Sequence, residues 1–123
     1  MRAALTLFVL FITHLSLASE WQIETLPSKP SLRGSAIKDG IIWVSGSNNT
    51  VYLSKDFGQT WQNISVNLEP KTDFRDIEVF DKNTAIVMGV GNGSQSKLYL
   101  TEDQGKTWQL INENQDNLGF YNS

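Results

Sequence analysis

The stretch that decides the fold is Ser54-Lys55-Asp56-Phe57-Gly58-Gln59-Thr60-Trp61-Gln62, because it returns as Thr101-Glu102-Asp103-Gln104-Gly105-Lys106-Thr107-Trp108-Gln109. Aspartate, glycine, threonine, tryptophan and glutamine recur in the same order, and Asp103 follows Asp56 by 47 residues. Self-similarity at such a period is the signature of repeat architectures, in which each unit buries its apolar surface against the next. Because this period is also a propeller-blade length, the repeat predicts tandem blades.

The similarity extends upstream of both stretches. Arg33-Gly34 corresponds to Arg75-Asp76, residues 43–46 correspond to 86–89, and residues 50–53 correspond to 97–100. Short β-rich runs separated by turn residues predict four strands in each repeat. We expect these strands at 35–38, 41–45, 50–54 and 60–66, and then at 74–80, 84–89, 97–101 and 107–112. Since no segment after the leader has an apolar stripe of helical period, the predicted fold is all-β, with two four-stranded antiparallel blades.

A third, partial copy precedes these two repeats. Trp21-Gln22-Ile23 resembles residues 61–63 and 108–110, and it predicts an N-terminal outer strand that completes the last blade of a propeller ring. We therefore divide the chain into an outer strand of a closing blade (19–30), blade 1 (31–70), blade 2 (71–115) and the start of a next blade (116–123). Propellers close with about four to eight blades, and two blades leave two open sheet edges. The chain is expected to be an open part of a longer propeller.

The first 18 residues are typical of a cleaved signal peptide. Arg2 supplies the positive charge, the segment 3–18 carries no Asp, Glu, Lys or Arg, and Ser16-Leu17-Ala18 places small residues where signal peptidase reads them. The alternative is an uncleaved anchor, but the stretch is shorter than the ~20 apolar residues that span a bilayer. We expect an exported protein, periplasmic or extracellular, with no stable membrane anchor after cleavage.

Composition argues against several kinds of site. The chain has 10 basic and 13 acidic residues, so a nucleic-acid partner held by bulk charge is not expected. It has no cysteine, which argues against a disulfide framework, a thiolate nucleophile and a lipid anchor on a terminal cysteine. Its one histidine, His14, lies in the leader, so carboxylates would have to supply every charged metal ligand. Without a phosphate-binding glycine loop either, we predict no metal site and no cofactor.

The repeated stretch has the pattern Ser/Thr-x-Asp-x-Gly-x-Thr-Trp, known as the Asp-box or BNR repeat. The aspartate can accept backbone N–H bonds across its own turn, glycine can take a positive φ, and tryptophan can bury a large ring between sheets. Asp56 and Asp103 resemble catalytic acids by residue type, but the structural interpretation is favoured. The predicted structural residues are Ser54, Asp56, Gly58, Thr60 and Trp61, with Thr101, Asp103, Gly105, Thr107 and Trp108 in the second copy.

Asp-box repeats occur in sialidases, in sortilin-type receptor propellers and in the photosystem II stability and assembly factor family. The chain resembles the last of these from Trp21 onward, through Leu32-Arg33-Gly34, Trp43-Val44-Ser45-Gly46 and Phe74-Arg75-Asp76 beside the two Asp-boxes. The resemblance implies an exported seven-bladed propeller that serves as a protein-binding or assembly scaffold. Photosynthetic members of that family chaperone a reaction-centre subunit. This chain departs from the family because it holds two blades and a strand.

Arg33 and Arg75 are the predicted binding residues. They stand at equivalent repeat positions, and the innermost strand of each propeller blade borders the central channel. Two such side chains could bind a carboxylate-bearing peptide through bidentate contacts. The alternative is that each arginine pairs with a local acid, Asp73 or Asp76.

A sialidase-like carbohydrate-binding or hydrolysing propeller is the alternative function. Sialidases use an arginine cluster, a Tyr–Glu nucleophile pair and an aspartic acid. Tyr52 and Tyr99 lie near the Asp-boxes, but they alternate with apolar neighbours as sheet residues do, and no glutamate is placed to activate either. We therefore expect no catalytic residues and no enzymatic activity, and we expect the partner to be another protein or peptide.

Overall fold

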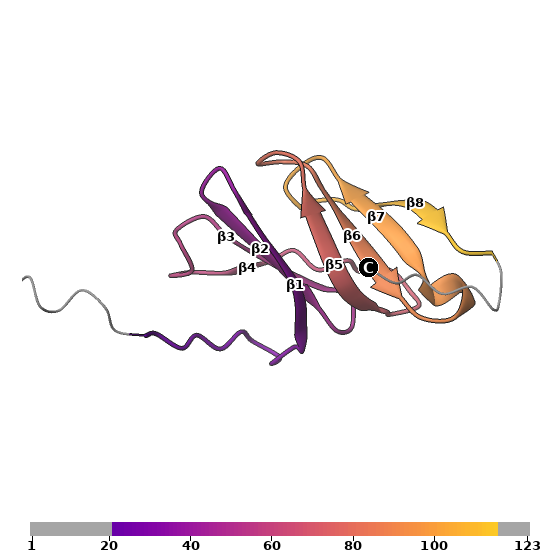
Figure 1. Cartoon of the computed structure of the whole chain (residues 1–123), viewed down its shortest axis with the longest axis horizontal. Helices are drawn as coiled ribbons and strands as arrows, with labels where there is room; N and C mark the ends of the chain where they lie inside the picture. The colour runs from indigo at the N-terminus through magenta and orange to yellow at the C-terminus, as the bar shows by residue number, and fades with distance from the viewer. Residues whose placement is uncertain (1–20, 116–123) are drawn as a thin grey trace, which may run out of the picture.

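The computed structural model describes residues 21–115 and consists of two four-stranded antiparallel sheets with strand orders β1-β2-β3-β4 and β5-β6-β7-β8 (Figure 1). The elements are β1 (Leu32–Lys38), β2 (Ile41–Gly46), β3 (Thr50–Ser54), β4 (Gln62–Asn63), β5 (Asp73–Val79), β6 (Ala85–Val90), the 3-10 helix η2 (Gly93–Gln95), β7 (Lys97–Thr101) and β8 (Gln109–Glu113). The predicted signal peptide (1–18) and the predicted start of a next blade (116–123) lie outside the described residues. The all-β prediction of two four-stranded blades is confirmed.

Tight turns form where the sequence places Asp-Gly and Asn-Asn. Asp39 and Gly40 have φ values of 52° and 76°, and Asn48 and Asn49 have values of 56° and 60°. Two consecutive residues with positive φ match the twist of antiparallel strands, and Asn, Asp and Gly tolerate this conformation best. These turns join β1 to β2 and β2 to β3, and they set the register of blade 1.

The fourth strand of blade 1 is shorter than predicted. We expected residues 60–66, whereas β4 comprises only Gln62–Asn63. At its start, Thr60 is held by Asp56 within the Asp-box turn. Beyond its end, the Ser65 hydroxyl accepts the Val51 N–H at 3.0 Å, so a side chain replaces a backbone acceptor of the ladder. Ser65 also makes local bonds with Asn63, whose Oδ1 accepts the Ser65 N–H at 3.0 Å, and local bonds of this kind compete with strand pairing.

The predicted N-terminal outer strand is not formed. Residues 21–30 contain no strand, and Trp21 and Ile23 are 98% and 94% exposed. An outer strand needs the third strand of its own blade as ladder partner, and neither sheet within residues 21–115 offers one to this segment. Leu26 is nevertheless buried against Val44 and Tyr52, so the segment lies along blade 1 without pairing.

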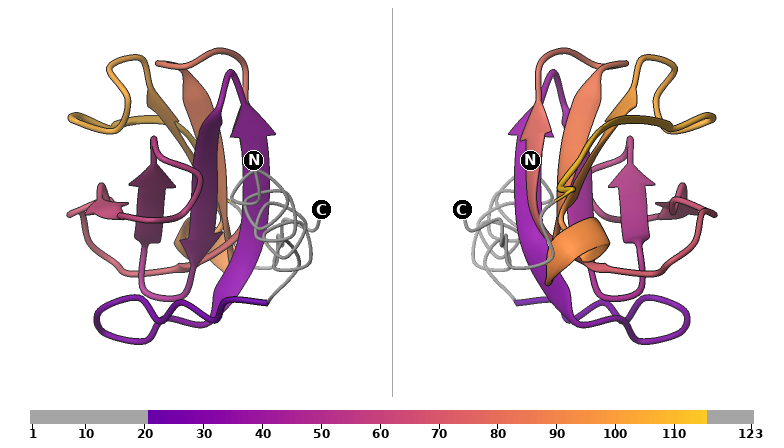
Figure 2. Two further views of the ribbon diagram at one scale, coloured as in Figure 1. Left: turned by 90° about the vertical axis from the view of Figure 1, so that its left-hand side faces the viewer. Right: turned by 90° about the vertical axis from the view of Figure 1, so that its right-hand side faces the viewer.

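The core lies between the two blades, which stand side by side in Figure 1 and one in front of the other in the views of Figure 2. One contiguous cluster joins both sheets, and within it the rings of Phe74 and Tyr99 meet edge to face with centroids 5.8 Å apart. The cluster consists of Ile41, Trp43, Val51, Leu53, Ile64 and Val66 from blade 1, with Phe74, Ile77, Ala85, Val87 and Tyr99 from blade 2. Each blade therefore buries one face against the other, as stacked repeats must.

One buried amide also fastens blade 1 to the start of blade 2. Asn49 is 0% exposed, and its Nδ2 donates to the carbonyls of Val66 and Leu68 at 3.3 and 2.8 Å. Its Oδ1 accepts the Thr72 N–H at 2.8 Å, just before β5. No sequence pattern marks Asn49 for this role, because its partners lie 17 to 23 positions further along the chain.

Candidate functional site

The first Asp-box forms a closed hydrogen-bond circuit. Asp56 Oδ1 accepts the Thr60 N–H at 2.8 Å, and Oδ2 accepts the Thr60 hydroxyl at 2.5 Å. Ser54 donates its hydroxyl to Asp56 at 2.8 Å and accepts the Gly58 N–H at 2.8 Å. Gly58 has a φ of 86°, a conformation that glycine adopts without a Cβ penalty. The Asp56 carboxylate therefore serves as the acceptor at the centre of its own turn.

The second Asp-box repeats this circuit almost atom for atom. Asp103 accepts the Thr107 N–H at 2.9 Å and the Thr107 hydroxyl at 2.6 Å. Thr101 donates to Asp103 at 2.9 Å and accepts the Gly105 N–H at 2.8 Å. Serine and threonine fill this role equally because each supplies a hydroxyl that both donates and accepts.

These bonds determine the protonation state of both aspartates. The hydroxyl and the N–H of Thr60 lower the pKa of Asp56 from 3.8 to about 2. The corresponding groups of Thr107 lower the pKa of Asp103 to about 2. A carboxylate that accepts several hydrogen bonds favours its charged form. At neutral pH both groups are therefore acceptors without a proton to give, unlike a general acid.

The tryptophan of the second Asp-box joins the two blades. Trp108 donates its Nε1–H to the carbonyl of Ile64 in blade 1 at 2.7 Å. The Ile64 side chain lies over Gly105, where a Cβ would come within 2.5 Å of Ile64 Cδ1. In blade 1 the equivalent Trp61 Nε1 is buried and has no hydrogen-bond partner within residues 21–115.

Arg33 and Arg75 occupy equivalent irregularities of the innermost strands. Leu32 and Gly34 pair with consecutive residues of β2, so Arg33 is the extra residue of a β-bulge. Phe74 and Asp76 likewise pair with consecutive residues of β6, which leaves Arg75 as the extra residue. Bulges of this kind re-aim a side chain and are common near functional sites. Sequence comparison had equated the two arginines, but it carried no signal for the bulges.

The two bulges lie close together. A Cβ added to Gly34, the residue after Arg33, would lie 3.1 Å from the Cα of Asp76, the residue after Arg75. Glycine therefore permits the close approach of β1 and β5 at the level of both arginines.

Local acids account for only one of these arginines. Arg33 Nε lies 3.4 Å from Asp73 Oδ2, and the two side chains are 48% and 29% exposed. Arg75 is exposed and makes no ion pair within the described part of the chain. Asp76 instead accepts the N–H of Ile77 at 2.9 Å. The structure thus pairs Arg33 with Asp73 and leaves the Arg75 guanidinium facing solvent.

Tyr52 and Tyr99 are core residues. They are 2% and 1% exposed, and the Tyr52 hydroxyl donates to the carbonyl of Pro27 at 3.1 Å. Burial, with a smaller effect of Glu113, raises the pKa of Tyr99. A phenol with a raised pKa and almost no exposure is poorly suited to act as a nucleophile at neutral pH.

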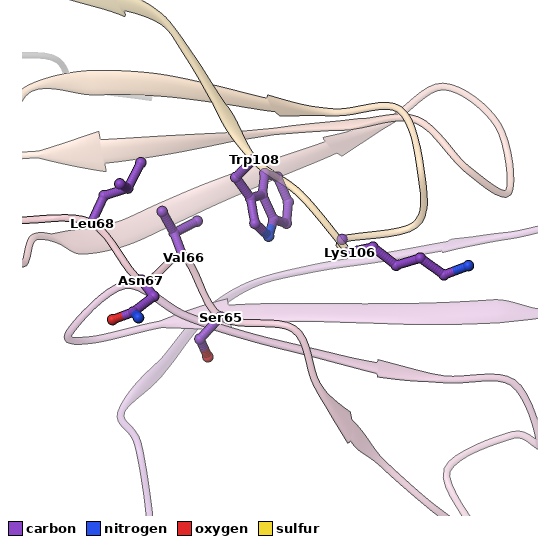
Figure 3. Close-up of a pocket in the computed structure, with 7 residues that line it drawn as sticks. Ser65, Val66, Asn67, Leu68, Lys106 and Trp108 are labelled. Atoms are coloured by element: carbon purple, nitrogen blue, oxygen red, sulfur yellow. The ribbon is translucent and has the colours of Figure 1, made fainter.

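A groove of about 220 Å³ follows the seam between the blades, away from both arginines. Figure 3 shows the Trp108 ring beside Val66 and Leu68 at this groove, which is lined by Ser65, Val66, Asn67, Leu68, Gly105, Lys106 and Trp108. No sequence pattern marks it, because its walls come from two blades.

Residues 21–115 hold neither a metal-ligand cluster nor a membrane-spanning helix. No group of three or more potential metal-ligating side chains gathers there. Nor does that part of the chain contain a helix of the length and apolarity that crossing a membrane requires.

Known proteins resemble the chain in sequence and in structure. It is 39% identical over 51 residues to the photosystem II assembly lipoprotein Ycf48 of Synechococcus sp. (strain CC9605). The aligned residues make up 42% of this chain and 15% of that protein. A solved structure described as YCF48 bound to D1 peptide superposes with a TM-score of 0.63 at 21% identity, covering 76% of this chain and 30% of the other. The chain therefore spans less than a third of each of these relatives.

The structural match shows that the two blades correspond to part of a propeller. A family model described as Sortilin-Vps10 (sortilin, neurotensin receptor 3) matches residues 22–123, which is nearly everything after the predicted signal peptide. By this match the chain belongs to the Sortilin-Vps10 family.

Proposed function

We propose that the chain is part of an exported propeller that binds another protein and acts as an assembly scaffold, and that it holds an acidic peptide segment at Arg33 and Arg75. The observation that carries this proposal is that two consecutive blades place an arginine at the same β-bulge of the innermost strand. A bulge disrupts the ladder, and a structural role for it would not require the same cation twice.

The chemistry of the two arginines suits carboxylate ligands. A guanidinium presents paired N–H donors that match a carboxylate in a bidentate arrangement. Arg75 is free to make such a contact, whereas Arg33 already shares its Nε with Asp73. A peptide carboxylate would engage Arg75 fully and Arg33 through its remaining donors. Because the bulges are adjacent, a peptide with two closely spaced acids would reach both.

The relatives support the peptide-binding part of the proposal. One is described as an assembly lipoprotein, and the other was solved with a bound D1 peptide. Export of this chain is supported by its own leader, in which Arg2 precedes a stretch free of Asp, Glu, Lys and Arg. A scaffold role needs a surface that recognises another chain, and the arginine bulges are the surface that we propose for it.

The hydrolase alternative gains no support from the site. Its two candidate tyrosines are buried in the sheets, and the two Asp-box carboxylates are committed to their own turns. The arginine bulges lack a neighbouring exposed tyrosine within the described residues, so the geometry favours binding over turnover.

The test is a binding titration with two fluorescent peptides, one rich in Asp and Glu and its counterpart with Asn and Gln at those positions. We expect the acidic peptide to bind more tightly. Arg75→Gln should weaken its binding by about tenfold, as expected for the loss of a charge-assisted hydrogen bond. Arg33→Gln should weaken it less, because Arg33 is already engaged by Asp73.

The double variant should also reduce the salt dependence of binding, since fewer charges are then neutralised. Lys55→Gln is the matched control, because it removes one exposed positive charge from an Asp-box turn, away from the inner strands. Equal affinity in native and double-variant protein would contradict the site, and turnover of a fluorogenic sialoside would favour the hydrolase.

A further inference from the structure

The two carboxylate oxygens of Asp73 have unlike surroundings. Oδ2 lies 3.4 Å from Arg33 Nε, across the boundary between the blades. Oδ1 is enclosed by the described chain and has no hydrogen-bond partner within residues 21–115. A carboxylate has about four acceptor sites, and a buried acceptor that lacks a donor lowers stability. Asp73 therefore neutralises Arg33 while one of its own oxygens remains unsatisfied.

The backbone on either side of Asp73 is fastened to blade 1. Before it, the Thr72 N–H donates to Asn49 Oδ1 at 2.8 Å. After it, the Phe74 carbonyl accepts the Ser45 hydroxyl at 3.2 Å, and Phe74 is 0% exposed. These contacts hold the start of β5 in place beside blade 1. A backbone shift that brought a donor to Asp73 Oδ1 would have to break one of them.

The carboxylate of Asp73 is not part of the repeat. Asp73 stands two residues before Arg75, and the residue two before Arg33 is Ser31. Ser31 fastens its strand start through backbone groups. Its N–H donates to the Ser47 hydroxyl at 3.0 Å, and its carbonyl accepts the Ser47 N–H at 3.0 Å. Because blade 1 forms without an acid at this position, a requirement of the fold does not explain Asp73.

The ion pair leaves the two arginines with different electrostatic surroundings. Arg33 and Asp73 form a neutral pair, although the Arg33 side chain is 48% exposed and has further donors. Arg75 is exposed and makes no ion pair within the described part of the chain. Its neighbour Asp76 accepts the Ile77 N–H at 2.9 Å. An incoming carboxylate therefore meets a competing carboxylate on Arg33, whereas no described residue holds Arg75 in this way.

We propose that Asp73 competes with the ligand for Arg33 and so determines which acidic peptides the site prefers. This inference rests on the proposed binding of acidic peptides at Arg33 and Arg75. In the native protein one carboxylate of the peptide binds Arg75, and a second must share Arg33 with Asp73 or displace it. The Asp73 side chain is 29% exposed, so rotation about its side-chain bonds can bring both oxygens to water. A second acid in the peptide therefore adds little affinity while Asp73 is present.

Removal of the Asp73 charge should let the site distinguish peptides with two closely spaced acids from peptides with one. Asp73→Asn keeps the size of the side chain and removes the competing charge. We expect it to tighten binding of a two-acid peptide by about tenfold, as for one added charge-assisted hydrogen bond. A one-acid peptide, held by Arg75, should gain about twofold at most, because exposed charges that are not in contact interact weakly. Asp73→Ser, which introduces the residue of blade 1, should act in the same direction.

Glu78→Gln is the matched control for the loss of charge. It removes one negative charge from the same strand, and Glu78 is exposed and in no ion pair among the described residues. It should change the affinity of either peptide by about twofold at most. A double-variant cycle then isolates the competition. In the Asp73→Asn background, Arg33→Gln should weaken two-acid binding by about tenfold, whereas in the Glu78→Gln background it should keep its smaller native effect.

Fluorescence titration of both peptides separates the competition at Arg33 from the site itself, and a thermal melt establishes that each variant is folded. An unchanged preference in both Asp73 variants, with binding still weakened by Arg75→Gln, would overturn the competition and leave the site intact. Acidic peptides that bind neither the native protein nor the Asp73 variants would contradict the site, and the competition with it. Binding of the two-acid peptide that appears only when Asp73 is replaced would support the competition.

Discussion

The two blades contain the same turn and differ in what lies across from it. The hydrogen bonds of the Asp56 and Asp103 circuits agree within 0.1 Å, although their sequences share only the defining residues. Across from the turn, blade 2 has Ile64 over Gly105 and a carbonyl for Trp108, whereas the described part of the chain provides neither counterpart for blade 1. The turn is therefore a local product of its own residues, while the packing around it depends on the neighbouring blade.

Substitution of the two turn glycines should give the largest difference in stability between the blades. Both have positive φ, 86° at Gly58 and 81° at Gly105, so alanine at either costs about 1–2 kcal/mol of backbone strain. Gly105→Ala also forces its Cβ against Ile64, and such overpacking adds about 1–3 kcal/mol. Urea unfolding should show the larger loss for Gly105→Ala. Equal losses of stability would mean that the Ile64 side chain moves away from the added methyl group without a further cost.

Substitution of the two Asp-box tryptophans should give a smaller difference in stability between the blades. Trp108→Phe leaves the Ile64 carbonyl without its donor and should cost about 1–2 kcal/mol more than Trp61→Phe, which removes an N–H that has no acceptor among residues 21–115. Similar loss of ring volume in both variants makes each the control for the other. Thermal melts would contradict the comparison if Trp61→Phe were the less stable.

Alanine at the two Asp-box aspartates should destabilise the protein equally in either blade, and these effects should be the smallest of the series. Asp56→Ala and Asp103→Ala should lower the denaturation midpoint by similar amounts and leave peptide binding by the folded fraction unchanged. Lost binding at unchanged stability would mean that these carboxylates act on the ligand.

Acid should act on both turns together. Because the pKa of each aspartate is about 2 in the fold and 3.8 ordinarily, the circuits stabilise the protein fully above pH 3.8 and lose this effect as the pH falls through 2. The midpoint of native protein should therefore fall over this interval, and the double alanine variant should show a flatter profile. Parallel profiles would assign the acid sensitivity to other groups.

The same division between local and neighbouring causes explains what the sequence could predict. Strands Thr50–Ser54 and Lys97–Thr101 were predicted to the residue, since each is fixed by a turn and an Asp-box on its own hairpin. The shortened β4 was missed because Ser65 replaces a backbone partner in three dimensions. The outer strand at Trp21 was expected from its resemblance to two other tryptophan segments, but a strand needs a ladder partner as well as a pattern.

The candidate site divides in the same way. The equivalence of Arg33 and Arg75 was visible in the repeat, whereas their bulges emerge only from pairing with β2 and β6. Which arginine remains free could not be predicted either, because Asp73 and Asp76 flank Arg75 in sequence and only Asp73 reaches an arginine, Arg33 of the other blade.

Asn49 has a consequence for the curvature of the whole array. Its side-chain amide hydrogen-bonds to Val66 and Leu68 at the end of one blade and to Thr72 just before the first strand of the next. These bonds lie where the chain passes from one blade to the next, so they help to fix the rotation between the two blades. The number of blades in a closed ring is 360° divided by that rotation. A side chain of four polar contacts at most thus helps to set the circumference of any ring these blades can enter.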